Sequence, residues 1–288
     1  MTEPPLDAAP LDEVAVRAAV VRPGGLWRSV DVVAVTGSTN ADLVARAAGG
    51  EPEGAVLAAE EQRAGRGRMG RTWTSPPRAA LTFSVLLRPA AVPRALLGWL
   101  PLLAGVAVAA AVRDVAAVDA QLKWPNDVLA GPAGVSAGGS GGVVPPRKVG
   151  GILAEAAGDA VVIGVGLNVS TGPAELPPPG PGALPATSLR LEGSPNLDRE
   201  RLLAGILAGL ERRYRTWSRV FGDTERSGLR AEYTGLCATL GRRVRVELPG
   251  GRLLDGLAAG VDADGRLLVS VPPAADLPVA AGDIVHLR

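Results

Sequence analysis

The sequence has very few of the residues on which most enzymes rely for acid–base or metal chemistry. Its 288 residues include one cysteine, Cys237, and one histidine, His286, close to the C-terminus. A single cysteine cannot close an internal disulfide, and a lone histidine leaves neither a zinc cluster nor a serine–histidine triad. We therefore expect no protein-bound metal and a chemistry that needs no histidine base.

Neither sign of charge is in excess. Thirty Lys and Arg residues stand against 29 Asp and Glu, a formal net charge of +1. Such a balance gives no chain-wide field to attract nucleic acid or an anionic membrane, so any cationic site must be local. Hydrophobic residues make up 47% of the chain, enough to bury a sizeable core. We expect a globular protein without a nucleic-acid partner.

Long hydrophobic runs are also scarce, with one uncharged stretch at residues 95–112. Its length suits a membrane span, but alanine and glycine make it weakly lipophilic and Pro101 interrupts it. We expect a helix buried in an α/β domain, and no membrane association. The N-terminus is acidic and proline-rich rather than basic and apolar, so it does not resemble a secretory signal and the protein is expected to be cytoplasmic.

The hydrophobic pattern predicts an alternation of short strands and helices. Residues 1–27 are rich in Pro and Ala and are expected to be poorly structured. Apolar residues at a helical repeat predict an amphipathic helix from Arg199 to Trp217. Strands are predicted at residues 30–35, 56–62 and 81–89, around 121–129, and on both sides of a turn at Gly158 and Asp159.

Two tracts rich in small residues and proline break this pattern. Residues 131–147 are dominated by Gly, Ser and Pro and predict a flexible insertion. A second loose tract covers about residues 172–185. After Cys237, short alternating strands separated by Gly-containing turns predict a small antiparallel barrel.

The segment GRGRMGR, residues 65–71, places three arginines among three glycines. Glycine lets the main chain approach a ligand, and the arginine fork suits phosphate or carboxylate, so the loop favours an anion. A solvated basic turn and a nucleic-acid patch remain alternatives. The GxGxxG pattern at Gly65, Gly67 and Gly70 does not indicate a Rossmann turn, because a proline-containing segment and a strand follow instead of a helix.

KWPNDVL, residues 123–129, combines a cation, an indole, an amide and a carboxylate around Pro125, which presets the backbone. Lys123, Asn126 and Asp127 are suited to contact a polar ligand, and Trp124 to form an apolar wall. The alternative is an ordinary surface turn with one buried tryptophan.

Three further segments have two interpretations each. Lys148 in KVGGILAE either snorkels at a strand end or points at a bound anion. Asn168 in GVGLNV either marks a turn or serves a site. In GSTN, residues 37–40, either Thr39 or Asn40 is suited to cap a short helix, or the polar side chains bind a ligand.

The five segments, in this order and spacing, resemble the motif series of the biotin protein ligase family over residues 36–169. The small C-terminal barrel agrees with the SH3-like domain of that family. The resemblance implies an α+β fold, with a class II synthetase-like mixed sheet flanked by helices in a catalytic domain at residues 28–235 and an SH3-like β-barrel at 236–288. Residues 1–27 are too few for a DNA-binding winged helix, so no repressor function is expected.

The resemblance also implies an activity. Such an enzyme forms biotinyl-5′-AMP from biotin and ATP with Mg²⁺, then transfers biotin to a lysine on the carboxyl carrier domain of an acyl-CoA or pyruvate carboxylase. We expect a monomer or weak homodimer, with the glycine and arginine loop disordered until it folds over biotin as a lid.

Site residues are carried over by matching the motifs. Arg66, Arg68 and Lys148 are the expected catalytic residues. The expected biotin-binding residues are Ser38, Thr39, Asn40, Gln62, Arg66, Gly67, Arg68 and Lys148. The expected nucleotide-binding residues are Arg71, Trp73, Lys123, Asn126, Asp127 and Asn168.

Three other functions stay open on the sequence. A lipoyl protein ligase would share the fold and the adenylation chemistry. A biotin sensor would bind the adenylate without transferring it. An RNA-binding protein would use the arginine loop and the barrel, and would show salt-sensitive binding.

Overall fold

The computed structural model of the chain describes residues 9–74, 76–131, 146–179, 183–248, 252–272, 275–280 and 282–287. Apart from its ends, the insertion expected at 131–147 lies outside the described residues. Most of the tract at 172–185 lies inside them.

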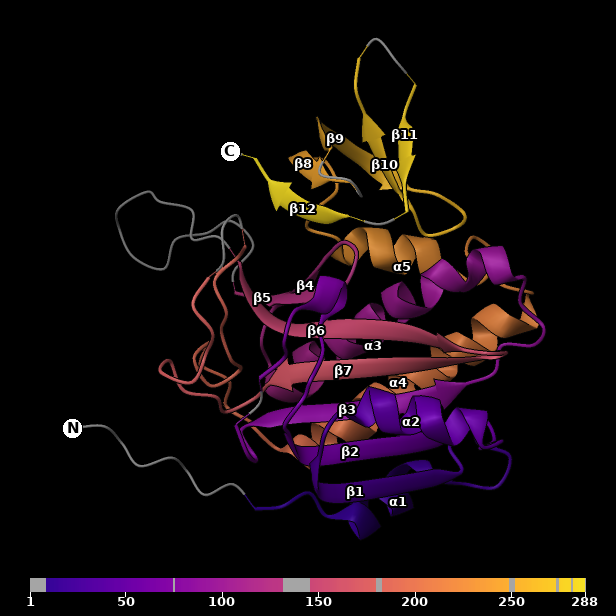
Figure 1. Cartoon of the computed structure of the whole chain (residues 1–288), viewed down its shortest axis with the longest axis vertical. Coiled ribbons are helices and arrows are strands. Elements are labelled where there is room, and N and C mark those ends of the chain that lie inside the picture. Colours follow the sequence, from indigo (N-terminus) through magenta and orange to yellow (C-terminus); the bar gives the residue numbers. More distant parts are fainter. Residues whose placement is uncertain are drawn as a thin grey trace.

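The larger part of the chain is built on a seven-stranded mixed sheet (Figure 1). Strands β1 and β2 pair in parallel, and the other neighbours pair antiparallel. The sheet has the order β1-β2-β3-β7-β6-β5-β4. Its strands are β1 (Ser29–Thr36), β2 (Ala55–Gln62), β3 (Ala80–Leu87), β4 (Ala120–Lys123), β5 (Asp127–Ala130), β6 (Arg147–Ala157) and β7 (Ala160–Asn168).

Helices cover both faces of this sheet, which confirms the expected α+β class (Figure 1). Helix α2 (Thr39–Ala48) lies on one face, against β2, β3, β6 and β7. The other face is covered by α3 (Trp99–Ala116), which packs in turn on α4 (Arg199–Arg219). The short helices are η1 (Arg68–Gly70), η2 (Arg94–Gly98) and α5 (Leu229–Leu236).

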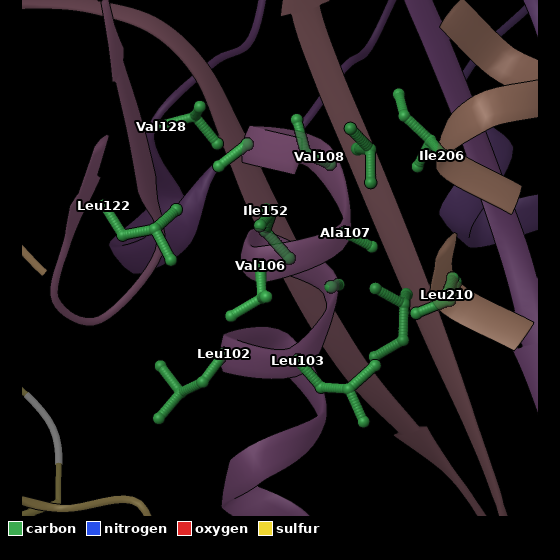
Figure 2. Close-up of a cluster of buried hydrophobic side chains, with 14 of the residues drawn as sticks. Leu102, Leu103, Val106, Ala107, Val108, Leu122, Val128, Ile152, Ile206 and Leu210 are labelled. Atoms are coloured by element: carbon green, nitrogen blue, oxygen red, sulfur yellow. The ribbon is translucent and has the colours of Figure 1, made fainter. Parts of the chain in front are cut away.

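The uncharged run forms α3, and its burial explains why it has no polar face. Figure 2 shows side chains of α3 between the sheet residues Val128 and Ile152 and the α4 residues Ile206 and Leu210. Both sides of the helix are thereby covered by protein. The segment Arg94–Ala116 is long and apolar enough to cross a membrane, but 67% of its most apolar window is buried inside the protein. The expectation of a buried core helix is confirmed.

The expectation of a poorly structured N-terminus was wrong for residues 9–27. Helix α1 (Glu13–Val20) begins at Asp12, whose side chain accepts from Ala15 N at 3.0 Å. Val16 and Val20 are buried in the main core. Glu13 and Arg17 hydrogen-bond main-chain groups of the edge strand β1. A helix of two turns has too few apolar positions for its periodicity to stand out in an alanine-rich sequence.

The C-terminal part is a five-stranded antiparallel sheet, as expected for the small domain. Two tryptophans attach it to the larger part: Trp99 Nε1 donates to Ala263 O at 2.8 Å, and Trp124 Nε1 donates to Gly265 O at 3.0 Å. Trp124 is therefore a core residue and not a wall of a ligand site. The strands are β8 (Arg243–Glu247), β9 (Leu253–Val261), β10 (Leu267–Ser270), β11 (Leu277–Val279) and β12 (Asp283–His286), in the order β11-β10-β9-β8-β12.

Candidate active site

One cavity of about 330 Å³ brings most of the expected site residues together. It lies on the α2 face of the sheet, at the N-terminal end of that helix. Twelve of the fourteen expected residues line it, all except Lys123 and Asp127. The twelve are Ser38, Thr39, Asn40, Gln62, Arg66, Gly67, Arg68, Arg71, Trp73, Asn126, Lys148 and Asn168.

The start of α2 forms a polar end of the cavity. Ser38 caps the helix, since its side chain accepts from Ala41 N at 3.4 Å; the prediction of Thr39 or Asn40 as the cap was wrong. Thr39 instead donates its main-chain N–H to Gln62 Oε1 at 2.9 Å. This contact turns the oxygen of the Gln62 amide towards α2 and leaves Nε2 to donate elsewhere.

Two residues at this end were not among the expected site residues. Ser84 is fully buried on β3 and joins Thr39 to Asn40, with O···O distances of 2.7 and 2.6 Å. Glu155 on β6 accepts from Asn40 Nδ2 at 2.8 Å. Ser84 lies in a strand outside the five motifs, and Glu155 is the last residue of KVGGILAE, from which only Lys148 was carried over as a site residue.

Glycines make the floor of the cavity. Gly164 and Gly166 occupy alternate positions on β7 and so share one face, and Gly151 on β6 pairs with Gly166. A Cβ at Gly166 would lie 2.4 Å from the Trp73 ring, and one at Gly164 only 2.1 Å from Asn40 Oδ1. The indole and the amide therefore occupy space that any side chain at these positions would fill.

The glycine and arginine loop has a hairpin-like path, and its ordering on biotin binding stays a prediction. Arg66 and Thr72 form an antiparallel bridge, and Gly67 N donates to Arg71 O at 2.6 Å. Gly70 has a φ of +72°, a backbone conformation that favours glycine. The loop returns Trp73 to the glycine floor and places Arg66, Arg68 and Arg71 on the cavity.

A β-bulge aims Lys148 into the same cavity. Strict alternation along β6 would put Lys148 on the face opposite Gly151 and Leu153. The pairing with β5 shifts at this point, so that Val128 faces Gly150 while Leu129 faces Lys148. Val149 turns into the core, and Lys148 joins Gly151 and Leu153 on the cavity. Bulges next to active sites commonly redirect a side chain in this way.

The KWPND turn lies behind Lys148. Asp127 Oδ1 is 2.5 Å from Lys148 Nζ, and Asp127 Oδ2 is 3.8 Å from Lys123 Nζ. Asn126 lines the cavity and exchanges hydrogen bonds with the main chain of Ile152. Lys123 and Asp127, which were expected to bind the nucleotide, are not among the residues that line the cavity, and their role at the nucleotide stays a prediction.

A proline wall completes the cavity on the side of Asn168. Asn168 is buried and donates Nδ2 to Thr187 O at 2.9 Å. This contact ties the end of β7 to the segment after the tract that was predicted to be loose. The wall residues, which the sequence did not indicate, are Pro177, Pro178, Pro179, Ala183, Leu184 and Ala186.

The cavity is suited to an elongated ligand with anionic groups. Four cationic side chains line it: those of Arg66, Arg68, Arg71 and Lys148. Arg66 Nη2 also lies 3.4 Å from Glu155 Oε1 at the polar end. Among the described residues no group of three or more His, Cys, Asp or Glu side chains could hold a metal ion. The arrangement can therefore align anions and stabilise developing charge without a histidine base or a protein-built metal centre.

Comparisons with known proteins agree with this geometry. Residues 33–168 match the model of the biotin/lipoate A/B protein ligase family, and residues 239–287 match the biotin protein ligase C-terminal domain. The chain is 45% identical to the biotin–[acetyl-CoA-carboxylase] ligase of Mycobacterium tuberculosis over 97% of each chain. It is 32% identical to the bifunctional ligase/repressor BirA of Escherichia coli over 84% of this chain and 69% of that one.

Solved structures share the fold. The biotin protein ligase of Aquifex aeolicus, in complex with biotin and ATP, superposes with a TM-score of 0.69 at 24% identity, covering 91% of this chain and all of that one. The Leishmania major enzyme in complex with biotin gives a TM-score of 0.56 at 26% identity, over 90% of this chain and 98% of that one. With the identity to the mycobacterial ligase along nearly the whole chain, these matches show that the chain belongs to the biotin protein ligase family.

Proposed function

We propose that the chain activates biotin with ATP as biotinyl-5′-AMP and then transfers biotin to a lysine of a carboxyl carrier domain. The observation that carries the proposal is the single cavity in which Ser38, Arg68 and Lys148 meet. A hydrogen-bonding end for the ureido ring and a cationic region for the carboxylate lie in one continuous space. Opposite ends of one small molecule can therefore be held at once.

The first step joins two anions. A carboxylate oxygen of biotin attacks the α-phosphorus of ATP, the bond from that phosphorus to the bridging oxygen breaks, and pyrophosphate leaves with the electron pair. The nucleophile is already ionised, so no general base is required. Arg66, Arg68 and Lys148 lower the repulsion between the reactants and stabilise charge on the phosphoryl oxygens.

In the second step the acceptor amine attacks the carbonyl carbon of the adenylate, and AMP leaves with the oxygen that had joined it to biotin. The amine loses a proton in this step. Asp127 does not line the cavity and is paired with Lys148, so we assign proton acceptance to solvent rather than to this carboxylate. Attack then depends mainly on how the carrier presents its lysine.

Magnesium fits this site only as the companion of ATP. The described residues include no carboxylate cluster that would hold the ion, and Mg²⁺ is commonly bound through substrate phosphates with few protein ligands. The arginines and Lys148 share the phosphate charge with whatever cation accompanies the nucleotide. We assign no step to the metal.

Biotin is favoured over lipoate by three observations. The C-terminal sheet matches the biotin protein ligase C-terminal domain, and the mycobacterial relative is named for acetyl-CoA carboxylase. The donors and acceptors at the start of α2 also suit a ureido ring better than a dithiolane, which has no N–H and no carbonyl. We therefore expect a biotin carboxyl carrier domain as the partner.

The test is incubation of the full chain with ATP, radiolabelled biotin and a purified carrier domain. Label on the carrier lysine is the expected result. Label retained as free adenylate would favour a biotin sensor, and modification by lipoate alone would favour a lipoyl ligase. A carrier variant with the acceptor lysine replaced by arginine is the matched control and should remain unlabelled.

A further inference from the structure

Glu155 terminates a chain of polar groups at the biotin end of the proposed site. From Gln62 the chain runs through Thr39, Ser84 and Asn40 to the carboxylate of Glu155. The successive heavy-atom distances are 3.1, 2.7, 2.6 and 2.8 Å. The chain therefore connects β2, α2, β3 and β6 directly beneath one end of the cavity.

The carboxylate fixes the orientation of the Asn40 amide. Asn40 Nδ2 lies 3.2 Å from Leu153 O and 2.8 Å from Glu155 Oε2, and both of these oxygens are acceptors. The two hydrogens of Nδ2 therefore point towards β6, and Asn40 Oδ1 must face the hydroxyl of Ser84. Gly164 leaves the space that this orientation needs, because a Cβ there would overlap Oδ1.

With Asn40 in this orientation, the contacts of the Thr39 and Ser84 hydroxyls outnumber the hydrogens available to fill them by one. Three oxygen–oxygen contacts link Gln62 Oε1 through Thr39 and Ser84 to Asn40 Oδ1. Both terminal oxygens accept only, and the two hydroxyls between them supply two hydrogens for three contacts. With the Asn40 amide reversed, Nδ2 would supply the missing hydrogen. Glu155 thus keeps this end of the site rich in acceptors.

We propose that Glu155 is a positioning residue that selects ligands carrying N–H donors, an inference that rests on the proposed function. Thr39 lines the cavity and presents the acceptor-rich chain to it. The ureido ring of biotin carries two N–H groups, whereas the dithiolane of lipoate carries none. The ion pair of Glu155 with Arg66, at 3.4 Å, holds the carboxylate in place and links this end of the site to the arginine loop.

Glu155→Gln separates this role from simple packing. Glutamine has nearly the same shape, but an NH2 donor replaces one of the two oxygens, so it cannot accept both at the position that faces Asn40 and at the position that faces Arg66. Its amide can also donate to Asn40 Oδ1, which permits the reversed orientation and fills the missing hydrogen. We expect the dissociation constant for biotin to rise about tenfold, with the KM for ATP unchanged within twofold and the melting temperature unchanged within a few degrees.

The decisive comparison uses Ser84→Ala as a second background, with biotin binding measured by calorimetry. Without the Ser84 hydroxyl the Asn40 orientation is no longer transmitted to Thr39. Glu155→Gln should then weaken binding by no more than twofold. Glu232→Gln, which removes the partner of Arg213 on the surface, is the matched control and should leave biotin affinity unchanged.

The outcomes are separable. An unchanged biotin affinity in Glu155→Gln, or the same tenfold loss in the Ser84→Ala background, would overturn the proposal for Glu155. If the glutamine variant folds poorly, Glu155→Asp can replace it, because aspartate keeps the charge on a shorter side chain. This variant should bind biotin with intermediate affinity. Wild-type affinity in a folded Glu155→Asp variant would also overturn the proposal for Glu155. Failure of the wild-type chain to bind biotin would instead reject the proposed function itself.

Discussion

Asp127 Oδ1 lies 2.5 Å from Lys148 Nζ, so a carboxylate beneath the cavity orients a cation inside it. Asp127 Oδ2 is also 3.8 Å from Lys123 Nζ, and Lys123 is not among the residues that line the cavity. The bulge in β6 and this ion pair act together: the first turns the Lys148 side chain into the site, and the second limits where its ammonium group lies. The protein's own contacts therefore position Lys148 in the cavity.

Replacing Lys148 with alanine should lower the rate of adenylate formation by about 10²–10³-fold, the usual cost of removing one preorganised donor from a charged transition state. The fold should survive, because Lys148 is a partly exposed strand-end residue. Pyrophosphate release with biotin and ATP, together with a thermal melt, measures both effects.

Asp127→Asn should lower the rate of adenylate formation less than Lys148→Ala does. The cation remains but loses its orienting charge, so the rate should fall about tenfold, an effect worth about 1.4 kcal/mol. A rate in Lys148→Ala within threefold of wild type would show that this cation has no part in the reaction.

Gly164→Ala should abolish tight biotin binding, because the new Cβ would meet Asn40 Oδ1 at 2.1 Å. Displacing the Asn40 amide breaks its contact with Ser84, and overpacking of this kind costs about 1–3 kcal/mol of folding stability. Gly235→Ala in α5 is the control, since nothing lies within 4 Å of its added Cβ. That variant should bind biotin normally and be slightly more stable. Equal biotin affinity in both variants would show that Asn40 has no role in biotin binding.

Amine-selective chemistry can be directed at the site because lysine is so rare. The chain has two lysines, Lys123 and Lys148, and 28 of its 30 basic residues are arginine. The Lys148 side chain is 30% exposed and that of Lys123 12%. Reductive methylation should therefore modify Lys148 first and lower adenylate formation. Biotin together with ATP should protect Lys148 from methylation, which peptide mass spectrometry would measure. Methylation of Lys148 at the same rate with and without both substrates would place this residue outside the ligand site.

The single histidine should make stability depend on pH. Burial, reinforced by the positive charges of Lys123 and Arg242, lowers the pKa of His286 from 6.5 to about 4. Below pH 6.5 His286 binds a proton in the unfolded chain but not in the folded chain. The free energy of unfolding therefore decreases as the pH falls from 6.5 towards 4. The loss should be about 2 kcal/mol, allowing for partial solvent exposure.

Urea unfolding at pH 7 and pH 4.5 tests this linkage. Carboxylates contribute to the same pH range, so the informative quantity is the difference between wild type and His286→Gln. The variant should lose less stability on acidification. Identical losses would show that His286 titrates alike in the folded and unfolded chains.

The elements that follow strong local patterns could be predicted from the sequence. Strands β1, β2 and β3 and helix α4 follow the apolar periodicity, and the uncharged run formed the buried helix α3. Helix α1 was missed because its two turns carry little pattern. Its stability comes from the Asp12 cap and from tertiary contacts with β1, and such contacts are not visible in a local window.

The site could be predicted only as far as its motifs reach. Motif order identified twelve residues that line the cavity. Only the three-dimensional arrangement shows that Lys123 and Asp127 are not part of the lining and that Asp127 instead pairs with Lys148. The inward direction of Lys148 depends on a bulge, which alternation cannot reveal. Ser84 and the proline wall were missed because their roles arise from strand pairing and chain return. Glu155 ends the KVGGILAE motif, but its role depends on its contact with Asn40, which the sequence does not show.

The central claim is that the biotin carboxylate attacks the α-phosphorus of ATP inside one cavity. Biotin labelled with ¹⁸O in both carboxylate oxygens tests it directly in a complete reaction with ATP and carrier domain. One labelled oxygen should appear in each AMP released and one should remain in the amide formed with the carrier lysine. Unlabelled AMP alongside biotinylated carrier, or formation of ADP and phosphate instead of AMP and pyrophosphate, would contradict the account.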